Sequence, residues 1–196
     1  CCRPRELGGE AESLRGEGLA MLSAVMSDLA DVPDVEAVSL LADDLPPVAF
    51  PHHPVTPSTE RRHFLRLARR SDYTLVIAPE FDNLLEERCR WVLEAGARLL
   101  GPGPEAVALT ADKYELGQHL SRQRVRDEPA WHVAQGKPAL PCVYKPRFGA
   151  GSLFTSVVRT WQEREHLLRS LPDMPFLVQR YRHGTRPASR SFSAPA

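Results

Sequence analysis

The sequence has no long apolar run and no excess of either charge. No stretch approaches the roughly 18 uninterrupted apolar residues of a membrane span, so no membrane partner is expected. Lys+Arg and Asp+Glu number 25 each, which gives a formal net charge of zero. Nucleic-acid-binding proteins usually carry a basic excess, so no nucleic-acid partner is expected either. With 42% hydrophobic and 26% charged residues, the composition is that of an ordinary globular protein.

Cysteine is scarce and poorly spaced for a metal. Cys1 and Cys2 are adjacent and Cys89 and Cys142 stand alone, without C-x-x-C or Cys/His ligand spacing, so no metal ligand is assigned. Cys89 falls in a helical pattern and Cys142 in a strand pattern, and both are predicted to be buried free thiols. The charged, Gly-containing start is not typical of a signal peptide. Together these features predict a reducing, cytoplasmic location.

The N-terminal half alternates helical and strand patterns. Residues 1–13 lack periodicity and are predicted to be a loose lead-in, after which apolar residues recur at three- and four-residue steps until Pro33. The continuously apolar run Tyr73–Ala78 is typical of a strand covered on both faces. Further helices are predicted over 59–70 and 83–95, and strands over 35–41, 73–78 and 97–100. This order predicts a small parallel sheet.

Two segments of this half are predicted to be solvated. The Pro-rich stretch 45–57 is predicted to form no regular element, and His52 and His53 within it are interpreted as loop residues, with ligand contact as the alternative. The helix over 59–70 carries five arginines outside its apolar positions. Because the whole chain is neutral, this pattern favours a solvated helix surface over a nucleic-acid patch.

The run from Gly101 to Pro104 is the strongest boundary signal in the chain. We therefore expect one domain over 1–103 and a second over 104–184. Residues 185–196 contain no acid and no core pattern, so they are predicted to be an irregular tail. In the second region, helices are predicted over 105–109, 112–123 and 160–170, the last opened by a capping box, and strands over 131–134, 142–146, 154–159 and 177–181.

In the second region, two strand patterns are joined by a Gly-containing turn that a lysine precedes. Lys145 lies near the end of the first strand, which holds its ammonium in one place. Gly149 and Gly151 allow the backbone to approach a ligand and to direct N–H groups at an anion, and Ser152 adds a hydroxyl donor. The strand-loop-strand order excludes a Walker loop and a Rossmann fingerprint. A plain β-hairpin turn is the alternative.

Lys113 strengthens the case for an anion. It lies at the start of a predicted helix, where a positive charge is unfavourable for the helix dipole. An incoming anion explains this position better than helix stability does. The alternative is that Lys113 pairs with Asp112 or Glu115.

Together, these segments resemble the ATP-grasp superfamily in order and spacing. The segments are GPGPEAVALTADKYELGQHL, PCVYKPRFGAGSLFTSVV and FLVQRYRHG, and the chain is most similar to carboxylate–amine ligases of the tyramine–glutamate ligase type. Two earlier segments, EGLAMLSAVMSDLADVPDVEAVSL and SDYTLVIAPEFDNLL, resemble the pre-ATP-grasp domain of that group. The resemblance spans residues 14–184. It implies an α/β protein in which a small parallel-sheet pre-ATP-grasp domain is followed by a partial α+β ATP-grasp domain.

The resemblance also assigns nucleotide-binding residues. Lys113 and Lys145 would bind the α- and β-phosphates, and Lys145 could also reach N7 of the base. Phe148 to Ser152, including Gly149 and Gly151, would form the lid over the γ-phosphate. A hinge strand would meet the adenine edge through its backbone and the Gln179 side chain; its residues are Gln179, Arg180, Tyr181 and Arg182. Glu80, at the end of a parallel strand, is either a contact to a second substrate or a loop carboxylate.

The chain departs from the family pattern near its end. Arg180 stands where the family usually has Glu, and residues 185–190 do not form the expected apolar strand. No catalytic residue and no metal ligand are assigned, because the acidic and Asn magnesium ligands belong to the half of the domain that does not follow. This ending, and a start at Cys1 in place of Met, predict a truncated or frame-shifted sequence.

The resemblance implies a parent protein that joins a small-molecule carboxylate to an amine. ATP would phosphorylate the carboxylate, the amine would attack the acyl phosphate, and Mg²⁺ is expected for the complete domain. A catalytically inactive nucleotide-binding or interaction module is the alternative. A third hypothesis is a flavodoxin-like α/β domain that binds no ATP. The sequence carries no signal for the oligomeric state.

Overall fold

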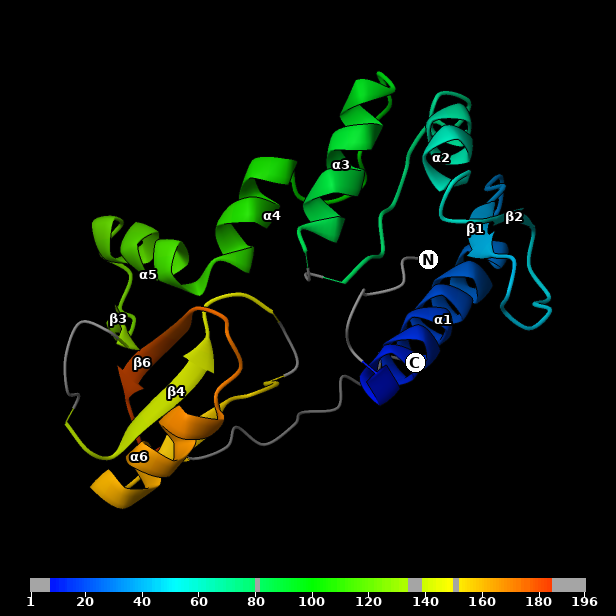
Figure 1. Cartoon of the computed structure of the whole chain (residues 1–196). Helices are drawn as coiled ribbons and strands as arrows, with labels where there is room; N and C mark the ends of the chain where they lie inside the picture. Colours follow the sequence, from blue (N-terminus) through cyan, green and yellow to red (C-terminus); the bar gives the residue numbers. More distant parts are fainter. Residues whose placement is uncertain (1–7, 80–81, 134–138, 150–151, 185–196) are drawn as a thin grey trace, which may run out of the picture. The chain divides into compact units, whose positions relative to one another are not determined.

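The computed structural model describes residues 8–79, 82–133, 139–149 and 152–184, with side chains from Arg15 on (Figure 1). Two compact units make up the chain. Unit 1 consists of Cys1–Leu116 with Phe148–Gly151, and unit 2 of Gly117–Arg147 with Ser152–Ala196. The domain division expected after Gly103 stays a prediction. None of the helices in the described ranges is both long and apolar enough to cross a membrane.

Unit 1 opens with a helix that is longer than predicted. Helix α1 (Gly8–Ala30) begins at Gly8, so the loose lead-in predicted for residues 1–13 is wrong from residue 8 on. The prediction relied on apolar periodicity, which the first turn of α1 lacks. Glu and Ala in this turn favour a helix through their intrinsic propensity, which does not require such a pattern. The helix ends at Ala30, in agreement with the stop predicted at Pro33.

The Pro-rich stretch contains a strand, which the sequence analysis excluded. β1 (Ser39–Ala42) pairs in parallel with β2 (His52–Val55), and the two predicted loop histidines lie half-buried within β2. The Pro51 and Val55 carbonyls accept hydrogen bonds from Ser39 N and Asp43 N, both at 3.1 Å. Residues 51 and 55 therefore face β1, and Pro54, which has no N–H, has its backbone on the outer side.

The two later strands predicted for this half of the chain are reduced to one isolated bridge. Thr74 and Leu99 pair in parallel, with Thr74 N donating to Arg98 O and Leu100 N donating to Thr74 O, both at 2.9 Å. The predicted parallel pairing of these two segments is confirmed, but the prediction that 73–78 is a strand covered on both faces is wrong. Tyr73 and Leu75 are 57% and 45% exposed, so the apolar run lacks the covering layers that such a strand needs.

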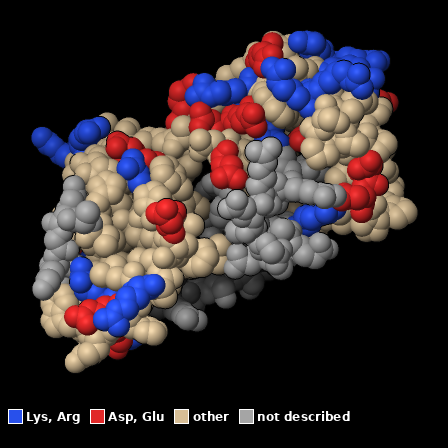
Figure 2. All heavy atoms as spheres, viewed as in Figure 1, with Lys and Arg blue, Asp and Glu red and all other residues tan. Residues whose placement is uncertain are grey.

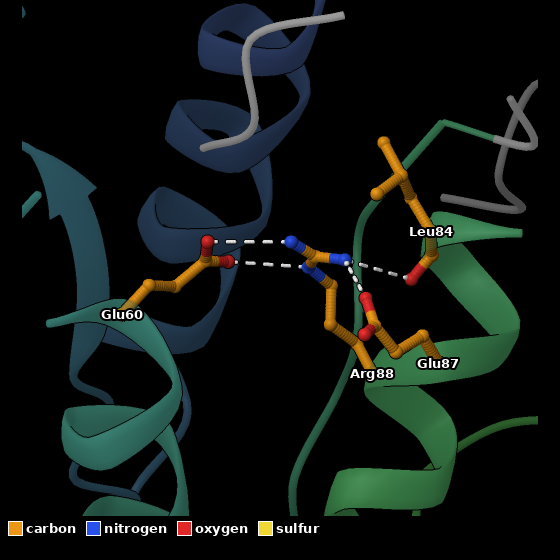
Figure 3. A network of polar contacts seen from close by, with 4 residues as sticks. All are labelled: Glu60, Leu84, Glu87 and Arg88. Atoms are coloured by element: carbon orange, nitrogen blue, oxygen red, sulfur yellow. Dashed lines mark hydrogen bonds and ion pairs between the residues drawn. The ribbon is translucent and has the colours of Figure 1, made fainter. Parts of the chain in front are cut away.

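A buried ion pair joins the two helices that follow. Arg88 of α3 (Leu84–Glu94) contacts Glu60 of α2 (Glu60–Ala68) through two hydrogen bonds of 3.1 and 3.2 Å (Figure 3). Its Nη1 donates to Leu84 O and Glu87 Oε2, and its guanidinium lies 4.9 Å from the Trp91 ring centroid. The helical spacing of Arg88 from Leu84 and Val92 puts it in the apolar stripe, yet the sequence analysis did not single it out.

Two helices lead into unit 2. α4 (Pro104–Ala111) ends at Asp112, whose ψ of 98° breaks the helical run. The Asp112 Oδ1 accepts hydrogen bonds from Tyr114 N and Glu115 N at 3.0 and 3.2 Å, which caps the start of α5 (Lys113–Arg122). The predicted pair of helices is confirmed, with the break at the Asp that precedes Lys113.

The described residues of unit 2 form a four-stranded antiparallel sheet and the helix α6 (Trp161–Ser170), and they include the end of α5. The strand order is β3-β6-β4-β5, formed by Ala130–His132, Phe176–Arg180, Cys142–Pro146 and Ser156–Val158. The core consists of Cys142, Tyr144, Val158 and Val178, against which Leu167 and Leu168 of α6 pack. The helix therefore covers the face of the sheet to which these four side chains point (Figure 1). Cys142 and, in unit 1, Cys89 are buried free thiols, as predicted.

The turn before β5 and the start of α6 are set by local backbone chemistry. β5 begins at Ser156 rather than Phe154, because Ser152 and Phe154 have φ of 58° and 54° and form a turn closed by Thr155 N and Ser152 O at 3.0 Å. Thr160 caps α6 by accepting from Glu163 N at 3.1 Å, as predicted. The Glu163 carboxylate accepts from Arg159 N at 2.8 Å, one residue before the cap.

Candidate functional site

Lys145 lies on β4, on the opposite face of the sheet from α6. Buried and half-buried residues alternate along this strand, and Tyr144 and Pro146 on either side of Lys145 are buried. Burial lowers the pKa of the Lys145 ammonium, and the nearby negative charge of Asp127 partly opposes this shift. Within the described residues, no carboxylate makes an ion pair with Lys145. The strand thus holds a half-buried cation that a bound anion could neutralise.

The register of the sheet aligns other residues with Lys145. Lys145 is opposite Leu177 of β6, which is opposite His132 of β3, so these three share one face. In the next row, Val143 is opposite Gln179. Lys145 and Gln179 are therefore diagonal neighbours on the same face, a relation that typically separates residues by about 7–8 Å. A strand lysine and a strand amide at this spacing can contact two parts of one ligand.

A segment before β3 holds the amide of Gln179 in a fixed orientation. The Gln179 Nε2 donates to the Glu128 carbonyl oxygen at 2.6 Å. A carbonyl only accepts, so the amide nitrogen faces Glu128 and the amide oxygen is left on the other side. The Glu128 carboxylate also pairs with Arg182 Nε at 2.6 Å. Glu128 therefore contacts two of the four predicted hinge residues.

The other two hinge residues are placed differently. Arg180 is opposite Cys142, so its exposed side chain lies on the α6 face, away from Gln179. Tyr181 continues the strand by donating its N–H to Pro141 O at 3.0 Å, and its ring packs edge-on against His183 with centroids 4.8 Å apart. The pairing of β6 with β4 thus puts Gln179, and not Arg180, on the sheet face of Lys145.

Lys113 contacts the predicted lid. It is the first residue of α5, and its ammonium donates a short hydrogen bond to the Gly149 carbonyl. Both residues belong to unit 1. Gly149 has a φ of 99°, a conformation that favours glycine, and Phe148 beside it is 44% exposed. Ser152 follows with a φ of 58°, whereas Gly151 lies outside the described residues. Because Lys113 and Lys145 lie in different units, their convergence on one polyphosphate stays a prediction.

The structure adds residues that the sequence analysis missed and leaves others undescribed. Asp127 and Glu128 come from an irregular segment without periodicity, and only their position before a strand could have drawn attention to them. Glu80 and the tail 185–196 lie outside the described residues. Among the residues that are described, no group of three or more His, Cys, Asp or Glu could hold a metal ion. A surface hollow of about 360 Å³ lies between β5 and α6 and includes none of the predicted nucleotide residues.

Comparison with known proteins gives the class of this fold. Residues 35–107 match the family model of the pre ATP-grasp 3 domain. None of the curated proteins matches the chain. With the antiparallel sheet of unit 2, the chain has the predicted fold class, an α/β pre-ATP-grasp domain followed by a partial α+β ATP-grasp domain.

Solved structures share this fold across most of the chain. N5-carboxyaminoimidazole synthetase from Staphylococcus aureus, complexed with ADP, is 16% identical with a TM-score of 0.61, and the match covers 82% of this chain and 44% of that one. The corresponding ribonucleotide synthetase from Thermotoga maritima is 14% identical with a TM-score of 0.60, over 82% and 43% of the two chains. The biotin carboxylase domain of a Hydrogenobacter thermophilus 2-oxoglutarate carboxylase, in complex with MgADP, is 14% identical with a TM-score of 0.59, over 84% and 42%.

The resemblance to the ATP-grasp superfamily is thereby confirmed at the level of the fold. The chain spans less than half the length of each of these three proteins. The narrower similarity to tyramine–glutamate ligases stays a prediction.

Proposed function

We propose that this chain carries the nucleotide-gripping part of an ATP-grasp ligase, which joins a small-molecule carboxylate to an amine through an acyl phosphate. The observation that carries the proposal is the half-buried Lys145, aligned with Gln179 on the sheet face opposite α6. The shared fold supports it, because two of the similar structures are complexed with ADP or MgADP. A cytoplasmic location is part of the same proposal.

Lys145 supplies charge where a nucleotide needs it. Burial lowers the pKa of Lys145 because it disfavours the charged ammonium. A bound phosphate stabilises the charged ammonium and so raises this pKa again. The ammonium donates to the phosphate and reaches N7 of the base from the same strand position. The protein contributes positioning and charge neutralisation, which dominate phosphoryl transfer.

Gln179 supports a preference for adenine. Its Nε2 is held by the Glu128 carbonyl, so its Oε1 is oriented as an acceptor. The 6-amino group of adenine donates a hydrogen bond to such an acceptor, whereas the 6-oxo group of guanine places a second acceptor against it. The hinge backbone of Arg180, Tyr181 and Arg182 completes the contact with the base edge.

Lys113 couples the nucleotide to the lid formed by Phe148 to Ser152. Its ammonium donates to the Gly149 carbonyl, and a triphosphate competes with that carbonyl for the same ammonium. When ATP binds, Lys113 exchanges the Gly149 carbonyl for a phosphate, and the conformation of the loop changes. ATP should therefore slow chymotrypsin cleavage at the exposed Phe148, and an unchanged cleavage rate would favour the reading of an α/β domain that binds no ATP.

Magnesium has no fitting set of ligands among the described residues, so no step is assigned to it in this chain. In the complete domain it would neutralise the phosphates during transfer to the carboxylate. The alternative, a catalytically inactive nucleotide-binding or interaction module, shares the site but not the reaction. Release of ADP in the presence of mixed amino-acid and amine substrates separates the two.

Calorimetry on the chain tests the nucleotide site. Lys145→Ala should weaken ATP binding by roughly 10- to 100-fold, since a hydrogen bond to a charged group contributes about 1.5–3 kcal/mol. Arg169→Ala is the matched control, because it removes one exposed positive charge from α6 and should bind ATP like the parent chain. The parent should also bind ATP more tightly than GTP. Equal ATP affinity in the Lys145 and Arg169 variants would sink the proposal.

A further inference from the structure

The apolar run 73–78 of unit 1 is extended, yet it is paired at one residue only. It contains neither a turn nor a bend, and its one bridge joins Thr74 to Leu99. In the described part of the chain, the backbone N–H and C=O groups of residues 75–78 have no hydrogen-bond partner. Residues 76–78 are half-buried. Backbone groups that are removed from water are almost always paired in a folded protein, so this run lacks a neighbour.

The existing bridge determines which backbone groups face the missing neighbour. Thr74 N donates to Arg98 O and Leu100 N donates to Thr74 O, so the backbone of Thr74 faces the segment 98–100. In an extended strand, the backbone groups of successive residues point to opposite sides. The N–H and C=O groups of residues 73, 75 and 77 therefore point away from this segment. They form an open strand edge on which donors and acceptors are regularly spaced.

This edge has none of the residues that usually prevent strand addition. Exposed strand edges are normally protected by a charge, a proline or a bulge. β2 has Pro54 on its outer side, whereas residues 73–78 include no charged residue and no proline. The helices α2 and α3 of the same unit, by contrast, carry both signs of charge, which appear in the upper part of Figure 2. An unprotected apolar edge of this kind is a template for pairing with another strand.

The sequence of the run is typical of a strand with neighbours on both sides. A continuous apolar run belongs to the interior of a parallel sheet, where both faces are covered. In the described structure the run is instead at an edge, with Tyr73 and Leu75 exposed. Leu100, which is opposite Leu75 in the register of the bridge, is 52% exposed on the same face. An added strand would turn this edge into the interior strand that the sequence predicts.

We propose that this edge binds an extended, continuously apolar peptide strand, which pairs with the N–H and C=O groups of residues 73, 75 and 77. In this mode of recognition, main-chain hydrogen bonds give affinity and the alternate side chains give specificity. The peptide is apolar because its side chains lie beside Leu75 and Ile77. A single strand needs only the roughly 4.8 Å that separates neighbouring strands, whereas a second copy of the chain would bring its own helices to this half-buried edge. The site includes no residue that is assigned to the nucleotide.

Amide hydrogen exchange in the full chain, followed by NMR, tests this proposal. The probe is a synthetic peptide with a central run of alternating Val and Ile, flanked by Lys residues that keep it in solution. Bound peptide should slow exchange at the Leu75 and Ile77 amides roughly tenfold or more, because each donates a new hydrogen bond. The Val76 and Ala78 amides, which point to the other side, should change less. The same peptide with a central Pro should have little effect.

Two proline variants distinguish the edge from the run as a whole. Leu75→Pro removes an N–H of the edge and should weaken binding of a labelled peptide at least about tenfold, as measured by fluorescence anisotropy. Val76→Pro is the matched control, because it removes an N–H that points away from the peptide, and it should bind like the parent chain. Leu75→Lys keeps the N–H but adds a charge to the edge, so it should bind with intermediate affinity. Circular dichroism checks that each variant remains folded.

Three results would overturn the proposal. The first is an absence of protection by the peptide, or equal protection of all residues from 75 to 78. The second is equal peptide binding in Leu75→Pro and Val76→Pro. The third is protection of Leu75 and Ile77 that grows with chain concentration in the absence of peptide, together with a dimer in sedimentation, because a second copy would then occupy the edge.

Discussion

Arg88 in unit 1 and Lys145 in unit 2 are both cations removed from water, and their surroundings are opposite. Arg88 is 6% exposed and meets Glu60, Glu87, a backbone carbonyl and the Trp91 ring. Lys145 is half-buried, and among the described residues only the more distant charge of Asp127 opposes its burial. Figure 3 shows how completely the Arg88 donors are used.

The difference separates a cation that holds the fold together from one that is available to a ligand. A guanidinium whose donors are occupied has little capacity for a new partner, and removing one member leaves the other charge buried and uncompensated. A lysine whose pKa burial has lowered is instead a candidate binding group, because an incoming anion relieves the cost of its burial. The following predictions test this contrast, beginning with the largest effect.

Removing the carboxylate from the buried pair should have the largest effect on stability. Glu60→Ala leaves the Arg88 guanidinium without its main partner, and losses of this kind are about 3–5 kcal/mol. Urea denaturation, followed by circular dichroism, measures the free energy of unfolding. ATP binding by the folded fraction should not change.

A double variant controls for this result. Glu60→Leu combined with Arg88→Met removes both charges and keeps apolar volume, so it should recover most of the stability lost in Glu60→Ala. If the double variant is as unstable as the single one, the loss does not arise from an uncompensated charge. The ion pair would then have a different role from the one assigned here.

A neighbour of Lys145 provides the next test, because it points to the other face of β4. The Tyr144 hydroxyl is buried and accepts a hydrogen bond from Arg164 Nε at 2.8 Å. Tyr144→Phe should lower the stability of unit 2 by about 0.5–1.5 kcal/mol, the usual contribution of a hydrogen bond. ATP affinity should stay unchanged by calorimetry. A loss of ATP affinity equal to that of Lys145→Ala would contradict the division of the two faces.

The smallest expected effect is on stability at Lys145 itself. Lys145→Met removes a cation that folding disfavours, so the free energy of unfolding should change by less than about 1 kcal/mol near neutral pH. The pKa of Lys145 in the folded state lies below the ordinary lysine value of 10.5. At pH values between these two pKa values, the unfolded chain binds more protons than the folded chain does. The parent should therefore gain stability relative to Lys145→Met as pH rises toward 10.5. A relative loss would reverse the sign of the burial effect.

The sequence predicted elements well where one local signal was decisive. Cys142–Pro146 is the strand expected from its apolar pattern, and α6 begins at its predicted cap. The prediction missed β2 because its proline content argued against any strand, although proline is tolerated in an edge strand. The prediction for 73–78 was too long a strand, because an apolar run does not show which elements cover it. Such failures arise from tertiary packing, which no local pattern contains.

Part of the site could also be predicted from local signals in the sequence. Lys113 and Lys145 could be chosen from the sequence because a lysine at a helix start and at a strand end is unusual. Asp127 and Glu128, which act on Lys145 and Gln179, come from an irregular segment whose position before a strand was its only signal. Their contribution depends on the register of β3 against β6, which becomes known only when the sheet is formed.

Pro54 affects whether a second copy of the chain can pair with the edge of the parallel sheet. Among the described residues β2 pairs with β1 alone, and the backbone of residue 54 is directed to the outer side. A second chain that added a strand there would find no N–H at that position, so the ladder between the two molecules would be interrupted. One proline thus protects the rim of the parallel sheet from intermolecular strand addition and the aggregation that follows from it.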